Sequence, residues 1–205
     1  TTGVLDGLID AWDGYLNNSY GVKYPLGYLN IGTIAAMATL AENYGNSVMN
    51  DHHFHYGYFI HSAAVIGEVA AQLAGDNKNW ITEKAQNYVE SLIRDVANPS
   101  TADPYFPQFR MFDWYHGHSF ASGLVSSGDG RNQESSSEDV NFALGLKMWG
   151  RAIGSDSLEA TGELMLLVMR RAMNQYYFFD NDSSNGVIPE EYSPHMVPGI
   201  LYENK

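Results

Sequence analysis

Two clusters of polar and aromatic side chains contain the residue types that acid–base chemistry needs. The first, at 50–58, reads Asn-Asp-His-His-Phe-His-Tyr-Gly-Tyr and surrounds the carboxyl group of Asp51 with imidazole and aromatic rings. The second joins Asp-Trp-Tyr-His-Gly-His-Ser at 113–119 to Asn-Gln-Glu-Ser-Ser-Ser-Glu at 132–138, which contains Glu134. Because hydrolysis of a glycosidic bond needs one protonated carboxyl group and one carboxylate, Asp51 and Glu134 are candidates for such a pair.

These carboxylates are also open to structural explanations. Asp51 could cap the N-terminus of the helix that follows it. Ser135 and Glu138 match a capping box, in which a serine hydroxyl and a glutamate exchange hydrogen bonds with amides of the first turn. Glu134 lies in the loop ahead of a helix that starts at Ser135 or, if the helix starts earlier, on the same face as Glu138. Capping therefore does not account for Glu134.

The rings in both clusters suit a carbohydrate ligand. Flat aromatic faces pack against the apolar faces of pyranose rings, and neighbouring polar groups bind the hydroxyl groups. We expect these contacts from Tyr56, Tyr58, Trp114, Tyr115, His116 and Asn132. The composition of the clusters therefore indicates a neutral polysaccharide.

Apolar residues recur at helical spacing along most of the chain. We expect two helices before residue 46, at about 4–16 and 34–44, and four more at about 58–73, 80–96, 135–153 and 157–178. Runs of Val and Ile alternating with helices, which a parallel sheet would require, are missing. The sequence predicts an all-α fold of antiparallel helical hairpins, a single domain over 1–205, with the polar clusters in the connections at 50–58 and 104–134.

Composition excludes several classes of partner. The 205 residues carry a formal net charge of −13, so nucleic acid and anionic membrane surfaces would be repelled. The absence of cysteine excludes disulfides and thiolate chemistry. The longest apolar run, at 31–41, is far shorter than the roughly 18 residues that a membrane span needs. We therefore expect neither a nucleic-acid nor a membrane partner.

The motifs at 50–58, 113–119 and 132–138 resemble those of glycoside hydrolase family 81, in the same order. The segment at 198–205 also resembles a stretch of this family, so the similarity covers roughly 48–205. The resemblance implies an endo-acting β-1,3-glucanase that inverts the anomeric configuration, needs no cofactor or metal, and acts outside the cell or at the cell wall. It also implies a cleft across an (α/α)6 toroid, here incomplete or abbreviated because the expected helices are about half of those a full toroid has.

The same resemblance assigns roles to individual residues. Asp51 matches the general acid, Glu134 the base that activates water, and Glu138 the second acidic residue beside it. Inversion requires the two working carboxyl groups to stand roughly 6.5 to 9.5 Å apart, with room for that water. The substrate-binding residues would be His55, Tyr58, Trp114, His116, His118 and Asn132.

A metal-dependent hydrolase is one alternative. Asp51, the pair His53 and His55, and the pair His116 and His118 offer nitrogen and oxygen ligands of the kind that zinc accepts. Neither pair has the spacing of a His-Glu-x-x-His site, which argues against this alternative.

A serine hydrolase and a non-catalytic module are two further alternatives. Gly-His-Ser-Phe-Ala at 117–121 is close to a nucleophile elbow, and Asp180 and His195 follow in the required order, but the strands that hold such an elbow are missing from the sequence. An incomplete toroid could also bind glucan through its aromatic rings without cleaving it.

Overall fold

The computed structural model describes residues 2–16, 44–73, 79–124, 128, 130–179 and 188–202, and helices dominate this part of the chain. The α-helices are α1 (Thr2–Leu16), α3 (His52–Leu73), α4 (Gln86–Ala97), α5 (Ser136–Ala152) and α6 (Asp156–Ala172). Short 3-10 turns lie at Asn46–Val48 and Ser193–His195, and π-helical turns at Ile81–Ala85 and Met173–Tyr177 adjoin α4 and α6. Short strands are β1 (Phe112–Asp113), β2 (His118–Ser119), β3 (Asn132–Gln133) and β4 (Leu201–Tyr202).

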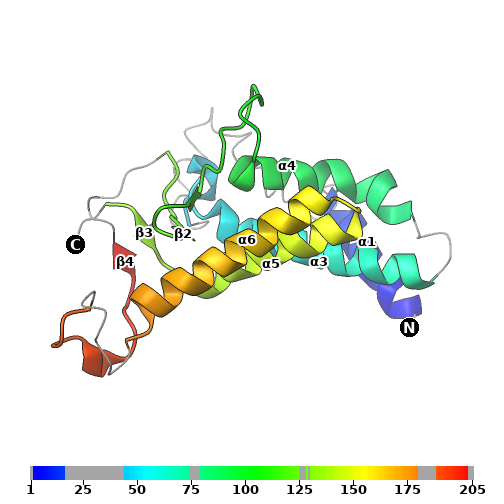
Figure 1. Ribbon diagram of the computed structural model, residues 1–205. Helices are drawn as coiled ribbons and strands as arrows, with labels where there is room; N and C mark the ends of the chain where they lie inside the picture. Colours follow the sequence, from blue (N-terminus) through cyan, green and yellow to red (C-terminus); the bar gives the residue numbers. More distant parts are fainter. Residues whose placement is uncertain are drawn as a thin grey trace.

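The centre of the fold is the parallel pair α3 and α5 (Figure 1). Gly57 of α3 faces the backbone of Phe142, and Gly145 of α5 faces the backbone of His61, so the two helices advance in the same direction. A β-carbon at either glycine would lie 3.1 Å from the facing backbone, and glycine therefore allows the helices to approach this closely. As a consequence, α3 and α5 begin at the same end of the molecule.

The helix α6 returns along α5 and forms a hairpin with it (Figure 1). Ser155 caps α6, because its hydroxyl accepts a hydrogen bond from Leu158 N at 3.5 Å. Gly150 lies against the backbone of Glu159, and Gly162 lies against the backbone of Lys147, as antiparallel helices in close contact require.

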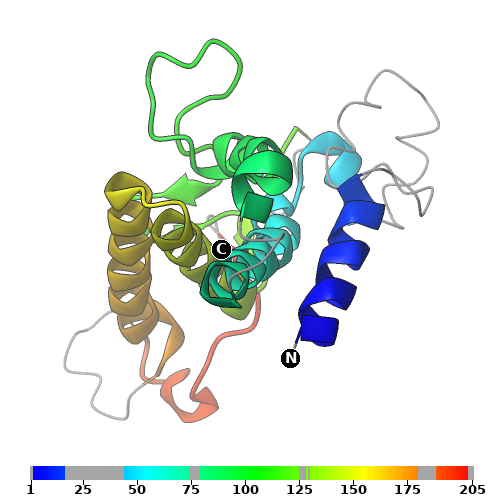
Figure 2. The ribbon, with the colours of Figure 1, turned by 90° about the vertical axis from the view of Figure 1, so that its right-hand side faces the viewer.

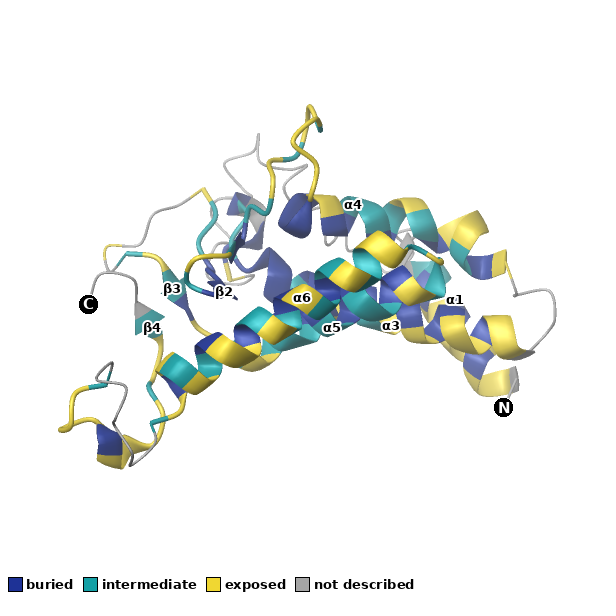
Figure 3. Cartoon of the chain, in the orientation of Figure 1, coloured by how far each residue is buried: buried dark blue, intermediate teal, exposed yellow. Residues whose placement is uncertain are grey.

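An apolar core joins these helices to α1 and α4. Trp12 of α1 packs edge-on against Trp80, with 5.7 Å between the ring centroids, and Figure 2 shows α1 on the outer side of α3. Buried residues concentrate on α3, α4 and α5, whereas α1 and α6 also expose much of their surface (Figure 3). The exposed apolar residues on these two outer helices include Val4, Leu8, Leu164 and Leu167.

The short strands lie near the end where α3 and α5 begin (Figure 1). The strand β1 pairs antiparallel with β2, with Phe112 opposite Ser119, and Gly117 with its φ of 77° lies in the turn between them. The strand β3 pairs antiparallel with β4, with Gln133 opposite Leu201. These pairings hold the second polar cluster against the helix ends.

The predicted all-α class is confirmed, with helices close to the ranges expected at 4–16, 80–96, 135–153 and 157–178. The expected helix at 34–44 lies outside the described residues, apart from Tyr44, which is in a turn. In the part of the chain that the structure describes, no helix is long and apolar enough to cross a membrane.

One predicted boundary is wrong. The helix α3 begins at His52 rather than near Tyr58, so most of the first polar cluster is helical and not a connection. Histidine and aromatic residues are modest helix formers, which made a loop the better expectation. Burial of this segment, with His53 and Tyr56 at 0% exposure, overrides that preference.

Candidate active site

Asp51 occupies a sharp corner just ahead of α3. Its φ is 57° and that of Met49 is 67°, a left-handed conformation that Asp tolerates better than most residues. Asp51 N donates to the carbonyl of Ala121 at 2.9 Å, and the Asp51 carbonyl accepts from His55 N at 3.0 Å. The backbone of Asp51 therefore closes the first turn of the helix and fixes the base of its side chain.

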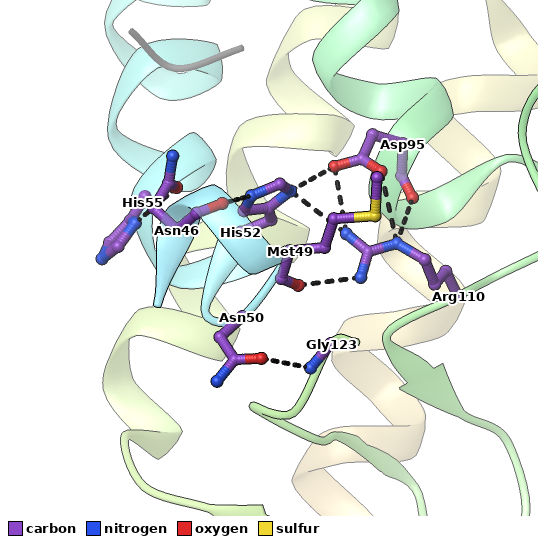
Figure 4. Close-up of polar contacts among 8 residues, drawn as sticks. All are labelled: Asn46, Met49, Asn50, His52, His55, Asp95, Arg110 and Gly123. Atoms are coloured by element: carbon purple, nitrogen blue, oxygen red, sulfur yellow. Dashed lines mark hydrogen bonds and ion pairs between the residues drawn. The ribbon is translucent and has the colours of Figure 1, made fainter. Parts of the chain in front are cut away.

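A buried network of charged and polar groups fixes the segment that contains this corner (Figure 4). Arg110 donates from Nε and Nη2 to the two carboxylate oxygens of Asp95, at 3.2 and 3.0 Å, and from Nη1 to the carbonyl of Met49 at 2.9 Å. His52 places Nδ1 2.5 Å from Asp95 Oδ2 and Nε2 2.8 Å from the carbonyl of Asn46. The network thus fixes residues on both sides of Asp51.

Asp95 is ionised in this network for a physical reason. Burial raises its pKa, but the hydrogen bond from His52 and the charges of His52 and Arg110 outweigh burial and lower the pKa below its usual range. The carboxylate that joins α4 to the corner therefore keeps its charge at neutral pH.

Glu134 and Glu138 flank the start of α5. Ser135 is the N-cap residue, because its hydroxyl accepts from Glu138 N at 3.4 Å. Glu134 is exposed in the loop immediately before it, which is the first of its two predicted positions. The carboxylate of Glu138 reaches α3, where Oε1 accepts from Tyr58 OH at 2.9 Å. The serine half of the predicted capping box is therefore confirmed, while the glutamate side chain links the two central helices.

A single residue connects the two segments that carry the carboxyl groups. The carbonyl of Ala121 accepts from Asp51 N at 2.9 Å, and Ala121 N donates to the carbonyl of Asn132 at 2.8 Å. Asn132 stands two residues before Glu134 in the sequence. Together with the shared starting end of α3 and α5, this connection holds the segments of Asp51 and Glu134 beside each other.

The environment of Asp51 favours its protonated form. Its exposure is 8%, and burial, followed by the negative charges of Glu134 and Glu138, raises its pKa to about 7. The effect of both glutamates also shows that the three carboxyl groups lie near one another. A carboxyl group that keeps its proton near neutral pH can donate it to a leaving oxygen.

The histidines of the first cluster differ in exposure. His55 is half-buried, with Nδ1 2.9 Å from Asn46 Oδ1, and burial, followed by the charge of His52, lowers its pKa. His53 is fully buried, with its ring centroid 3.8 Å from that of Phe54. Burial lowers the pKa of His53 well below its usual value. Of these two, His55 is the one that solvent can reach.

The histidines of the second cluster differ in the same way. His116 is partly exposed, and its Nδ1 lies 3.1 Å from Asp113 Oδ2. His118 is 3% exposed, with Nδ1 2.9 Å from the carbonyl of Ser119, and burial lowers its pKa. The sugar contact expected of His118 stays a prediction, and its placement is in the interior.

Both polar clusters contain aromatic rings that are exposed to solvent. Tyr58 is 57% exposed and Trp114 is 38% exposed. A pocket of about 480 Å³ opens beside Trp114 and is also lined by Asp113 and Arg131. Tyr56 is fully buried, with its ring centroid 4.5 Å from that of His52, so the expectation that it contacts sugar is wrong.

The geometry gives little support to a serine nucleophile or a metal centre. Ser119 is fully buried, and its hydroxyl donates to Asp139 at 2.6 Å rather than facing a histidine. Asp180 lies outside the described residues, and His195 is exposed beside Tyr192. Within the described ranges, no group of three or more His, Asp or Glu side chains could hold a metal ion.

Sequence reasoning missed the buried carboxylates of Asp95 and Asp139. Each occupies an apolar helix face, Asp95 three residues after Leu92 and Asp139 three residues before Phe142. An acidic residue within an apolar stripe requires a buried partner, and that was the available signal. The partners themselves come from distant segments and could not be read from the sequence.

In an all-α domain, a carboxyl group with a raised pKa near two glutamates is the kind of arrangement that hydrolysis of a glycosidic bond requires. The chain belongs to glycoside hydrolase family 81, since the model of the Glycosyl hydrolase family 81 C-terminal domain matches residues 1–205. The match includes residues 1–47, for which the sequence alone had shown no resemblance.

Relatives share substantial identity with the chain. It is 41% identical to Glucan endo-1,3-beta-D-glucosidase 2 of Saccharomyces cerevisiae, covering 100% of this chain and 26% of the relative. It is 45% identical to the Primary septum glucan endo-1,3-beta-D-glucosidase of Schizosaccharomyces pombe, covering 89% of this chain and 18% of the relative. The chain thus spans about a quarter of these relatives or less.

A solved structure shows the same fold. The glycoside hydrolase family 81 protein of Clostridium thermocellum matches with a TM-score of 0.63 and 35% identity, over 75% of this chain and 20% of that one. The match supports the expected toroid-type arrangement of helical hairpins.

Proposed function

We propose that this domain hydrolyses internal bonds of β-1,3-glucan with inversion of the anomeric configuration. The observation that carries the proposal is the environment of Asp51, whose pKa is raised to about 7 by burial and by two nearby glutamates. The substrate follows from the relatives, which are named as glucan endo-1,3-beta-D-glucosidases. An activity outside the cell or at the cell wall is supported by the name of the fission yeast relative, a primary septum glucan endo-1,3-beta-D-glucosidase.

In this proposal Asp51 is the general acid. It donates its proton to the glycosidic oxygen as the bond to the anomeric carbon breaks. Glu134, exposed to solvent, accepts a proton from a water molecule that attacks the opposite face of the sugar. The separation that this inverting reaction requires is roughly 6.5 to 9.5 Å between the carboxyl groups.

In this proposal Glu138 acts on Asp51 and on Tyr58. Its charge helps to keep Asp51 protonated, and its hydrogen bond orients Tyr58 at the surface of the site. The exposed rings of Tyr58 and Trp114 offer stacking surfaces for glucose units. Polar contacts would come from His55, His116 and Asn132, while the buried His118 would support them from the interior.

The decisive assay measures reducing ends released from laminarin. Asp51→Asn and Glu134→Gln should each lower kcat by about 10² to 10⁴-fold, because each removes one proton-transfer group. Glu83→Gln is the matched control, since Glu83 is an exposed glutamate on a turn ahead of α4 and should not affect the rate.

The alternative of a non-catalytic glucan-binding fragment gives a different result. A wild-type chain that binds laminarin in isothermal titration calorimetry but releases no reducing ends would refute the proposal for this chain.

A further inference from the structure

Asp139 is another buried carboxylate close to the candidate site. It lies near the start of α5 with 0% exposure and accepts three hydrogen bonds. Ser119 donates to it from Oγ at 2.6 Å and from N at 2.8 Å, and Gln133 Nε2 donates at 2.8 Å. Burial raises the pKa of Asp139 to about 6, and these three bonds act in the opposite direction. A buried carboxylate bonded this fully holds its partners in a fixed geometry.

Gln133 connects Asp139 to the backbone on both sides of Glu134. Its side chain is 1% exposed and donates to Asp139, while its Oε1 accepts from Ser135 N at 3.1 Å. The Gln133 backbone is paired with Leu201 in the sheet of β3 and β4. Both sequence neighbours of Glu134 are therefore fixed, and the main freedom left to Glu134 is rotation of its own side chain.

Ser119 connects Asp139 to the segment that contacts Asp51. Two residues after it, Ala121 bonds to both Asp51 N and the carbonyl of Asn132. Asp139 therefore anchors the strand through which the two carboxyl-bearing segments are connected.

We propose that Asp139 is a positioning residue, which sets where Glu134 stands relative to Asp51 through its bonds to Gln133 and Ser119. Its burial prevents contact with substrate, so it acts through these partners. The inference rests on the proposed function, in which the separation of the two carboxyl groups determines the rate. A displacement of about 1 Å in a catalytic group can cost about 100-fold in rate.

Two variants separate positioning from loss of charge. In Asp139→Asn the amide oxygen can still accept from Ser119 N and Gln133, and the Ser119 hydroxyl can turn to accept from the new NH₂ group. This variant should keep kcat on laminarin within about fivefold of wild type. Gln133→Met removes the bonds to Asp139 and to Ser135 N while keeping two bonds on Asp139, and should lower kcat about 100-fold with KM changed less than threefold.

Met165→Ala controls for a general loss of stability. Met165 of α6 is buried in the apolar core, so this variant destabilises the fold without removing a hydrogen bond of Asp139, Gln133 or Ser119. The inference is overturned if Gln133→Met loses no more kcat than Met165→Ala when both are fully folded. It is also overturned if Gln133→Met lowers the residual rate of Glu134→Ala by a further 100-fold, because positioning of Glu134 cannot matter once Glu134 is absent.

Hydrogen exchange tests the inference without relying on activity. The amide of Ser135 should be protected in wild type, Asp139→Asn and Met165→Ala, and should exchange at least tenfold faster in Gln133→Met. Unchanged exchange in Gln133→Met would refute the positioning role. A wild type that releases no sugar but shows the expected exchange pattern would refute the proposed function alone.

Discussion

The proposed chemistry follows from the raised pKa of Asp51. Its carboxyl group should titrate near pH 7 instead of near the usual 3.8, because burial and two negative neighbours oppose ionisation. Carbon-13 NMR of labelled aspartate should show this titration. In Glu138→Gln the midpoint should fall, since one of the two opposing charges is removed, whereas an unchanged midpoint would mean that Glu138 is too far from Asp51 to act on it.

Activity should follow the same titration. A general acid must be protonated, so kcat/KM on laminarin should fall as the pH rises through about 7 and Asp51 loses its proton. Because a general acid and a general base are needed in opposite protonation states, the profile should be bell-shaped with an optimum on the acidic side of neutrality. A flat profile from about pH 4 to 9 would count against two titrating carboxyl groups.

The raised pKa of Asp51 should make the folded state less stable as the pH rises, whereas a salt-bridged carboxylate makes it more stable. The folded pKa of Asp51 is about 7 and its usual value is 3.8, so the folded state binds the proton more tightly and loses stability as the pH rises between these values. Asp51→Asn should therefore stabilise the domain at pH 8 by about 1 to 3 kcal/mol and have little effect at pH 4. Urea unfolding at both pH values measures this, and an equal effect at both would contradict the assigned cause.

The roles of single residues were only partly predictable from the sequence. The motif and its crowded composition indicated Asp51 and Glu134, and the loop position, one of the two predicted for Glu134, is the one that the structure has. The left-handed backbone of Asp51 and its raised pKa depend on Ala121 and Glu138, which come from distant segments. No local pattern around residue 51 encodes those contacts.

At the element scale, the close approach of α3 and α5 brings the two motifs together. Gly145→Ala would place a β-carbon 3.1 Å from His61 N and push the helices apart, so it should cost about 1 to 3 kcal/mol of unfolding free energy and lower kcat. Gly7→Ala is the matched control in a helix, since nothing lies within 4 Å of its β-carbon position, and it should be neutral or stabilising by up to about 1 kcal/mol. Chemical denaturation of both variants tests the packing.

The ion pair between Arg110 and Asp95, which links α4 to the Asp51 corner, should stabilise the fold. Arg110→Met would leave Asp95 buried without its arginine partner and should cost about 3 to 5 kcal/mol of unfolding free energy. Adding Asp95→Asn to that variant should recover part of the loss, because the uncompensated charge is removed. If thermal denaturation shows the double variant to be less stable than Arg110→Met alone, the network does not act as a charge pair.

The helices themselves were easier to predict than their ends. Apolar periodicity located α1, α4, α5 and α6 because each buries a continuous stripe. The start of α3 was misplaced because its first turns consist of histidines and aromatic residues whose burial depends on Asp95, Arg110 and the second cluster. Tertiary contacts overrode the local preference there.

For the whole molecule, the all-α class was predictable, while the way in which its helices pair was not. Parallel packing of α3 and α5 depends on glycines that meet across a long sequence separation. The net charge of −13 is compatible with a neutral glucan as ligand.

The chain spans 26% of the budding yeast relative. On α6, apolar residues such as Leu164 and Leu167 are about half exposed.

The stereochemistry of the first products tests the central claim most directly. Proton NMR of a laminari-oligosaccharide, recorded from the first minutes of incubation with the wild-type chain, should show the α-anomer of the new reducing end before mutarotation produces the β-anomer. Neither Asp51→Asn nor Glu134→Gln should give this signal at a comparable rate. Appearance of the β-anomer first, or of no new reducing end at all, would contradict the assignment of Asp51 and Glu134 as an inverting acid–base pair.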